Sequence, residues 1–232
     1  MRNALLLLAL CALSTVAFGQ ATPSPIGESA VWQASSDFLS QAHSACDKAT
    51  PSSKFADCVI NLMSKAGASG EAVSFTRELY KQSGGEVGIM SGFHKVGPVD
   101  VASVKYPLRN SNGLLLVNGK PRMVNAEDLK LLDQKGLQQS FQFHDLQNQF
   151  PQVAVFPGDR NGEVWPNTQT GNSGGLQFII GYPLRNGCAT CADAGHALFT
   201  WNFDPSGKFK GTSFMGMTPA PLSQSGQSAP QQ

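Results

Sequence analysis

Two cysteines close together in the sequence carry its clearest chemical signal. Cys188 and Cys191 form a C-x-x-C pair, and His196 follows five residues later. Such a pair can be a disulfide, a redox-active dithiol or part of a zinc or copper site. A redox dithiol normally opens a helix after the first strand of a βαβ unit, whereas this pair comes late, among expected antiparallel strands. We interpret it as a structural disulfide, with a redox pair or a metal site as the alternatives.

The metal alternative includes Cys188, Cys191 and His196 as its candidate ligands. A structural zinc usually has four ligands, and the spacing of the other histidines does not indicate a fourth. Covalent haem attachment needs a histidine directly after the second cysteine, where Ala192 stands. We therefore expect no cofactor, with zinc or copper as the alternative. Because no complete catalytic set is recognisable, the sequence favours a protein that is not an enzyme.

A second cysteine pair, Cys46 and Cys58, lies in a helical pattern. Apolar residues recur at spacings of three and four from residue 31 to 46 and again from 55 to 66, with a break at 50–52. An antiparallel hairpin of these two helices brings the two cysteines together. We predict a disulfide between them, which contributes roughly 3 kcal/mol by the chain-entropy model.

The sequence Tyr-Pro-Leu-Arg-Asn occurs twice, at 106–110 and at 182–186. The simpler interpretation is that two strands leave the sheet through similar turns. The alternative is that Arg109 and Arg185 occupy equivalent strand ends and bind one anion between them. We name these two arginines as candidate ligand-binding residues.

A glycine-rich stretch surrounds Ser173. Residues 171–175 resemble the nucleophile loop of trypsin-like serine proteases, in which backbone N–H groups stabilise an oxyanion. The resemblance covers five residues, and it implies a nucleophilic serine with a partner histidine. His94 lacks the small-residue surroundings of that family's histidine. We interpret the stretch as a loop.

The N-terminus has the organisation of a secretory signal peptide. Residues 1–19 contain Arg2, an apolar run from 4 to 13 and a region of small residues. Residues 20–29 are expected to be a linker, 30–219 a single domain and 220–232 a disordered tail. No later apolar run is long enough to span a membrane. We expect a periplasmic or secreted protein, and removal of 1–19 leaves an even number of cysteines, which favours disulfides.

The charge of the chain restricts the choice of partners. Charged residues make up 14% of the sequence, and removal of 1–19 takes away one arginine and leaves a formal net charge of zero. Such a chain has no global electrostatic attraction for nucleic acid. The partner stays open between a small molecule and an envelope component. We predict an exported, disulfide-stabilised protein with a non-catalytic binding or envelope-associated role, with a thiol-redox or metal-binding protein as the alternative.

The candidate cysteines and arginines must be positioned by the fold, which we predict to be α+β. Three helical patterns end near Gly84, and strand patterns with tight turns follow from Val87 onward. Asn118-Gly119 is typical of a two-residue type I′ hairpin turn, and residues 204–207 are typical of a second tight turn. We expect an N-terminal helical hairpin, or three-helix segment, packed on a mostly antiparallel sheet.

Overall fold

The computed structural model describes residues 24–46, 52–109, 111–158, 165–171 and 173–219. Helices and antiparallel sheets are both present, so the predicted α+β class is confirmed. The predicted signal peptide, 1–19, and the predicted tail, 220–232, lie outside the described residues.

The N-terminal part is helical. It contains η1 (Glu28–Ala30), α1 (Ser36–Cys46), α2 (Ser52–Lys65) and α3 (Gly70–Gln82). Ser69 caps α3, because its Oγ accepts a hydrogen bond of 3.0 Å from the Ala72 backbone N–H. In the described ranges, no helix is both long and apolar enough to cross a membrane.

The strands form two antiparallel sheets where the sequence predicted one. The four-stranded sheet has the order β1 (Ile89–His94), β2 (Asp100–Tyr106), β3 (Ser111–Val117), β4 (Met123–Asn125). The five-stranded sheet has the order β5 (Val153–Val155), β7 (Leu176–Asn186), β8 (Asp193–Phe203), β9 (Phe209–Pro219), with β6 (Asn167–Thr170) also paired to β7. Between them in sequence lie η2 (Leu129–Leu131), α4 (Gln134–Gln138) and α5 (Phe141–Gln149).

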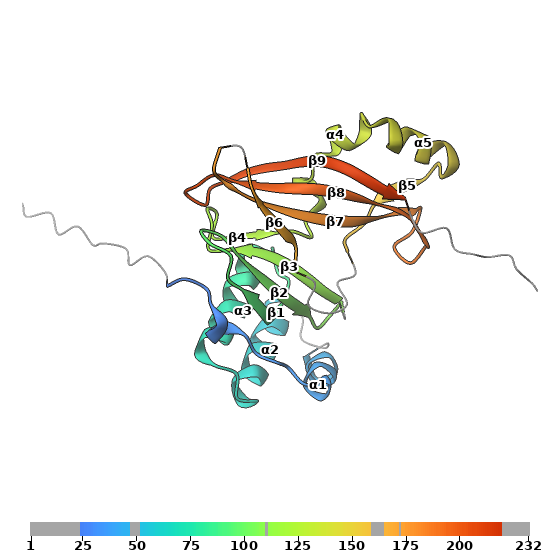
Figure 1. Cartoon of the computed structure of the whole chain (residues 1–232). Helices are drawn as coiled ribbons and strands as arrows, with labels where there is room; N and C mark the ends of the chain where they lie inside the picture. The colour runs from blue at the N-terminus through green and yellow to red at the C-terminus, as the bar shows by residue number, and fades with distance from the viewer. Residues whose placement is uncertain (1–23, 47–51, 110, 159–164, 172, 220–232) are drawn as a thin grey trace, which may run out of the picture.

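The four-stranded sheet is the middle layer of the molecule. Figure 1 shows it between helices α1–α3 and the five-stranded sheet, with α4 and α5 beside β9. Both faces of β2 and β3 are buried, because Phe75 and Leu79 of α3 pack on one face and the second sheet packs on the other. Burial on both faces explains why the run 114–117 is apolar without a break. Apolar and polar residues do not alternate in it, so the sequence does not reveal that a second sheet covers one face.

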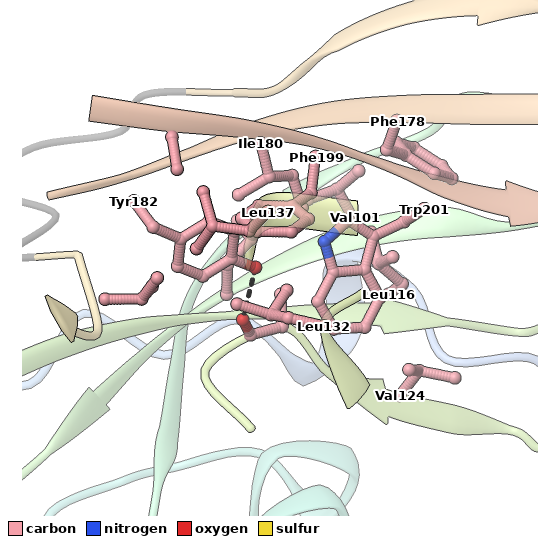
Figure 2. Close-up of a cluster of buried hydrophobic side chains, with 14 of the residues drawn as sticks. Val101, Leu116, Val124, Leu132, Leu137, Phe178, Ile180, Tyr182, Phe199 and Trp201 are labelled. Carbon is pink, nitrogen blue, oxygen red and sulfur yellow. Dashed lines mark hydrogen bonds between the residues drawn. The ribbon is translucent and has the colours of Figure 1, made fainter. Parts of the chain in front are cut away.

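The core between the two sheets holds most of the largest buried side chains. Trp201, Phe199 and Phe178 of the five-stranded sheet pack with Val101 and Leu116 of the four-stranded sheet. Figure 2 shows these side chains meeting between the layers. In the same cluster, the buried Tyr182 hydroxyl donates a hydrogen bond of 2.6 Å to the backbone carbonyl of Ala126. Because successive side chains of a strand point to opposite faces, the residues next to these inward side chains face outward.

The segment before residue 30 is also held in place. Ile26, within the range expected as a linker, is buried, and its backbone pairs with the Asn118 side chain. Asn118 Oδ1 accepts from Ile26 N (2.7 Å), while its Nδ2 donates to Ile26 O and to Asp100 Oδ2 (both 2.8 Å). The packed structure therefore includes residues before the predicted boundary at residue 30.

The predicted type I′ turn at Asn118-Gly119 is wrong. Val117 pairs with Met123, so the loop spans 118–122, and only Asn118 of the two has a positive φ, 67°. The loop is longer because it joins the second sheet: Lys120 N donates to Gly207 O (2.8 Å), and Phe209 N donates to Lys120 O (2.9 Å). The tight turn at 204–207 is present, with Gly207 N donating to Asp204 O.

Candidate functional site

Both predicted disulfides are formed, one in the helical layer and one at the tip of a hairpin. Cys46 of α1 is joined to Cys58 of α2, and Cys188 is joined to Cys191 in the turn between β7 and β8. The second disulfide is half-buried rather than enclosed. These cysteines contribute covalent cross-links to the fold.

Arg185 connects the two strands at the base of this hairpin. Its Nε lies 2.6 Å from Asp193 Oδ1, and its Nη1 donates to the backbone carbonyl of Ala189 inside the turn. Asp193 Oδ2 also lies 3.5 Å from His196 Nε2. The guanidinium therefore holds the conformation of the disulfide loop. Its charge, of the kind that favours a thiolate in a reduced pair, is shared with Asp193.

A metal site at this hairpin would have to form from groups that already interact with one another. Both cysteine sulfurs are in the disulfide, and His196 faces Asp193. Within the described part of the chain there is no cluster of three or more His, Cys, Asp or Glu side chains that could hold a metal ion. The metal alternative thus depends on reduction of Cys188 and Cys191.

The two candidate arginines have separate carboxylate partners. Arg109 Nε lies 3.0 Å from Glu86 Oε1, and its guanidinium lies 4.2 Å from the centre of the Tyr106 ring, a cation–π contact. Arg185 pairs with Asp193 instead. A shared anion between Arg109 and Arg185 stays a prediction.

The repeated pentapeptide has different structures in its two copies. In the first, β2 ends at Tyr106 and the chain turns; in the second, β7 continues to Asn186. Both tyrosines are buried, and burial raises the pKa of the Tyr106 hydroxyl, with Glu86 adding to the effect. The two copies therefore share a buried tyrosine but not a turn, since Tyr106 ends β2 and Tyr182 lies within β7.

A row of polar side chains crosses the outward face of the five-stranded sheet, and sequence reasoning missed it. Strand register places Gln169 of β6 opposite Gln177 of β7, and Gln177 opposite Asn202 of β8. Gln169 Nε2 donates to Gln177 Oε1 (2.9 Å), and Gln177 Nε2 donates to Asn202 Oδ1 (2.7 Å). Asn202 Nδ2 continues the row to Ser213 Oγ of β9 (3.2 Å). We call these four side chains the amide row.

A hollow of about 420 Å³ opens beside the amide row. Its lining combines Gln177 and Asn202 with residues of the adjoining loops and strand ends: Gly171, Ser173, Gly175, Phe203, Asp204 and Lys210. Gly175 lets the loop approach β8 closely, because a Cβ there would lie 2.0 Å from the Phe203 carbonyl oxygen. The hollow is therefore shaped by backbone packing as well as by side chains.

Asp204 is the acidic group of this hollow, and local hydrogen bonds hold it charged. Its Oδ1 accepts from Ser206 Oγ (2.7 Å) and from the backbone N–H groups of Ser206 (2.9 Å) and Lys208 (3.0 Å). The Ser206 hydroxyl, followed by the Lys208 N–H, lowers the pKa of Asp204. With Lys210 on the same lining, the hollow carries one charge of each sign near neutral pH.

Ser173 lies on the lining of this hollow, but the described residues around it include no histidine. The partner base that the protease resemblance implies is therefore not supplied by the described lining. The serine contributes a hydroxyl to a polar surface.

Comparison with known proteins adds no relative: no family model matches the chain, and neither a curated protein nor a solved structure matches it.

Proposed function

We propose that this chain is an exported, disulfide-stabilised protein, periplasmic or secreted, that binds a small molecule or an envelope component without turnover. The observation that carries the proposal is the amide row opening into the hollow on the five-stranded sheet. Gln177 and Asn202 are half-buried and held in place by hydrogen bonds, and such side chains are suited to recognition. The two disulfides and the signal-like residues 1–19 support an oxidising location.

The placement of the helices supports the same proposal. We infer that the disulfide-linked helices α1 and α2 pack with α3 as one segment on the four-stranded sheet. Phe38, Phe55, Val59 and Met63 form a common cluster with Ala72 of α3. The five-stranded sheet, which carries the amide row, lies on the other side of the four-stranded sheet from α1–α3 (Figure 1).

A double substitution of the hairpin cysteines tests the structural role of that disulfide. We expect Cys188→Ser/Cys191→Ser to lower the free energy of unfolding by about 2 kcal/mol, since the closed loop is short. Chemical denaturation followed by circular dichroism measures this loss.

We also expect the wild-type protein to show no catalysis of disulfide exchange, measured by reduction of insulin in the presence of a dithiol.

The thiol-redox alternative is favoured by one observation, the position of Arg185 beside a half-buried disulfide. It makes the opposite prediction. If the wild-type protein catalyses insulin reduction, and the double variant loses that activity with unchanged stability, the redox function replaces the binding function.

A further inference from the structure

We propose that the hollow on the five-stranded sheet binds a neutral N-acetylated saccharide, with Gln177 as the residue that recognises the acetamido group. This inference rests on the proposed binding function and names the ligand class for it. It is carried by the hydrogen-bonding capacity that the amide row leaves unused, by the charges of the lining and by the position of the hollow within the sheet.

The carboxamide of Gln177 has one donor and one acceptor position to spare. Its Oε1 accepts one hydrogen bond from Gln169, and its Nε2 donates one to Asn202. A primary amide offers two N–H groups and two lone pairs, so among these contacts one of each remains. An acetamido group is a trans amide whose N–H and C=O point in opposite directions, so it meets Gln177 through one group at a time: its C=O accepts from the spare Nε2–H, or its N–H donates to the spare Oε1 lone pair.

The amide row also fixes the orientation of this carboxamide before a ligand arrives. Hydrogen bonds on both sides hold Gln177, and Gly171 lies so close that a Cβ there would be 3.2 Å from Gln177 Cδ. A ligand therefore does not have to order this side chain on binding, which reduces the entropic cost.

The rest of the lining suits hydroxyl groups and gives no net attraction for a strongly charged ligand. Ser173, Lys210 and Asp204 provide a hydroxyl, an ammonium and a carboxylate. Among the described residues, the hydrogen bonds to Asp204 end on Oδ1, so Oδ2 remains as an acceptor for a sugar hydroxyl. Because the two charges are opposite, an anion or a cation is attracted by one and repelled by the other, so the pair gives neither a large net attraction. A neutral polyhydroxylated ligand can hydrogen-bond to both groups through its hydroxyls.

The position of the hollow argues against a peptide that binds as an added strand. Such a peptide needs the free backbone of an edge strand. Gln177 and Asn202 lie on β7 and β8, which both have paired neighbours on each side: β5 or β6 and β8 for β7, and β7 and β9 for β8. Of the lining residues that lie within strands, Lys210 alone is on an edge strand, β9. Recognition here depends on side chains, which favours the saccharide.

Nuclear magnetic resonance titration of the disulfide-bonded mature protein tests this proposal. The probes are chitotriose in its fully N-acetylated form, the cationic trimer that results when its acetyl groups are removed, and a neutral tripeptide with both ends blocked. We expect chitotriose to shift the side-chain amide signals of Gln177 and Asn202 with a Kd of about 1 mM, and the de-N-acetylated trimer to bind at least about tenfold more weakly.

Three variants separate recognition from folding. Gln177→Leu keeps the side-chain size, and we expect it to weaken chitotriose binding about tenfold. Lys210→Gln, on the exposed rim, is expected to weaken binding several-fold with the fold unchanged. Gln82→Leu is the matched control, because Gln82 also makes a side-chain hydrogen bond (3.1 Å to Glu78) but lies on α3. We expect it to bind as the wild type does.

The outcomes distinguish this inference from the function on which it rests. Shifts at Gln177 caused by the tripeptide and not by chitotriose would overturn the saccharide assignment and leave a binding function in place. No shift with any probe, or equal binding by Gln177→Leu and wild type, would also overturn it. Catalysed disulfide exchange in the insulin assay would overturn the binding function itself.

Discussion

Replacing Trp201 with alanine is expected to lower the free energy of unfolding by about 4 kcal/mol, the largest effect of any substitution considered for this chain. Trp201 has 0% exposure, and its ring stacks on Phe209 with centroids 5.6 Å apart. It fills the core between the two sheets, as Figure 2 shows. Its removal leaves a cavity. Because β8 is hydrogen-bonded to β7 on one side and to β9 on the other, the strand cannot easily move to fill that cavity.

Trp201→Phe is the matched control for that prediction. The indole Nε1 has no hydrogen-bond partner among the described residues, although it is fully buried. Phenylalanine loses volume but also removes this unpaired donor, so we expect a loss of about 1 to 2 kcal/mol. Urea denaturation followed by circular dichroism measures both variants. Equal losses for alanine and phenylalanine would contradict the proposed role of packing volume.

Removal of the helical disulfide is expected to have the second largest effect. We predict that Cys46→Ala/Cys58→Ala lowers the free energy of unfolding by about 3 kcal/mol, because the two cysteines are 12 residues apart and their cross-link restricts the unfolded chain. Cys46 is also fully buried, so its sulfur contributes packing. The same denaturation measurement, made without reductant, gives this value.

The hairpin variant Cys188→Ser/Cys191→Ser provides the comparison for the helical one, since its closed loop is shorter and its expected loss is smaller. A larger loss from the hairpin variant would contradict this order. The helical variant is also expected to bind chitotriose as the wild type does when folded, because its disulfide belongs to the helical layer and not to the lining of the hollow.

The elements that sequence predicted well are those encoded by local patterns. The apolar spacing around Cys46 and Cys58 indicated helices close enough for a disulfide, and the composition of residues 204–207 indicated a tight turn. Both depend on residues near one another in the chain, where periodicity and turn chemistry are informative.

The features that sequence missed depend on contacts between distant segments. The division into two sheets cannot be predicted from the run 114–117. These residues are buried on both faces, and an unbroken apolar run does not tell whether helices or a second sheet cover each face.

The amide row depends on the register of β6, β7 and β8, which places Gln177 between Gln169 and Asn202. The only sequence signal was a polar residue at an outward position of each strand, and many solvent-facing strands share it. The loop at 118–122 also follows a distant contact, the pairing of Lys120 with Gly207.

The most direct test of the central claim, that this is an exported protein with both disulfides formed, is the intact mass of the protein recovered from the periplasm or medium. The cells are treated with N-ethylmaleimide before lysis, and no reductant is added. We predict a chain that lacks residues 1–19, carries no adduct and is four hydrogens lighter than the reduced chain, because both disulfides are formed. Adducts on Cys188 and Cys191 in most of the exported protein, or a chain that keeps residues 1–19 and stays in the cytoplasm, would contradict the account.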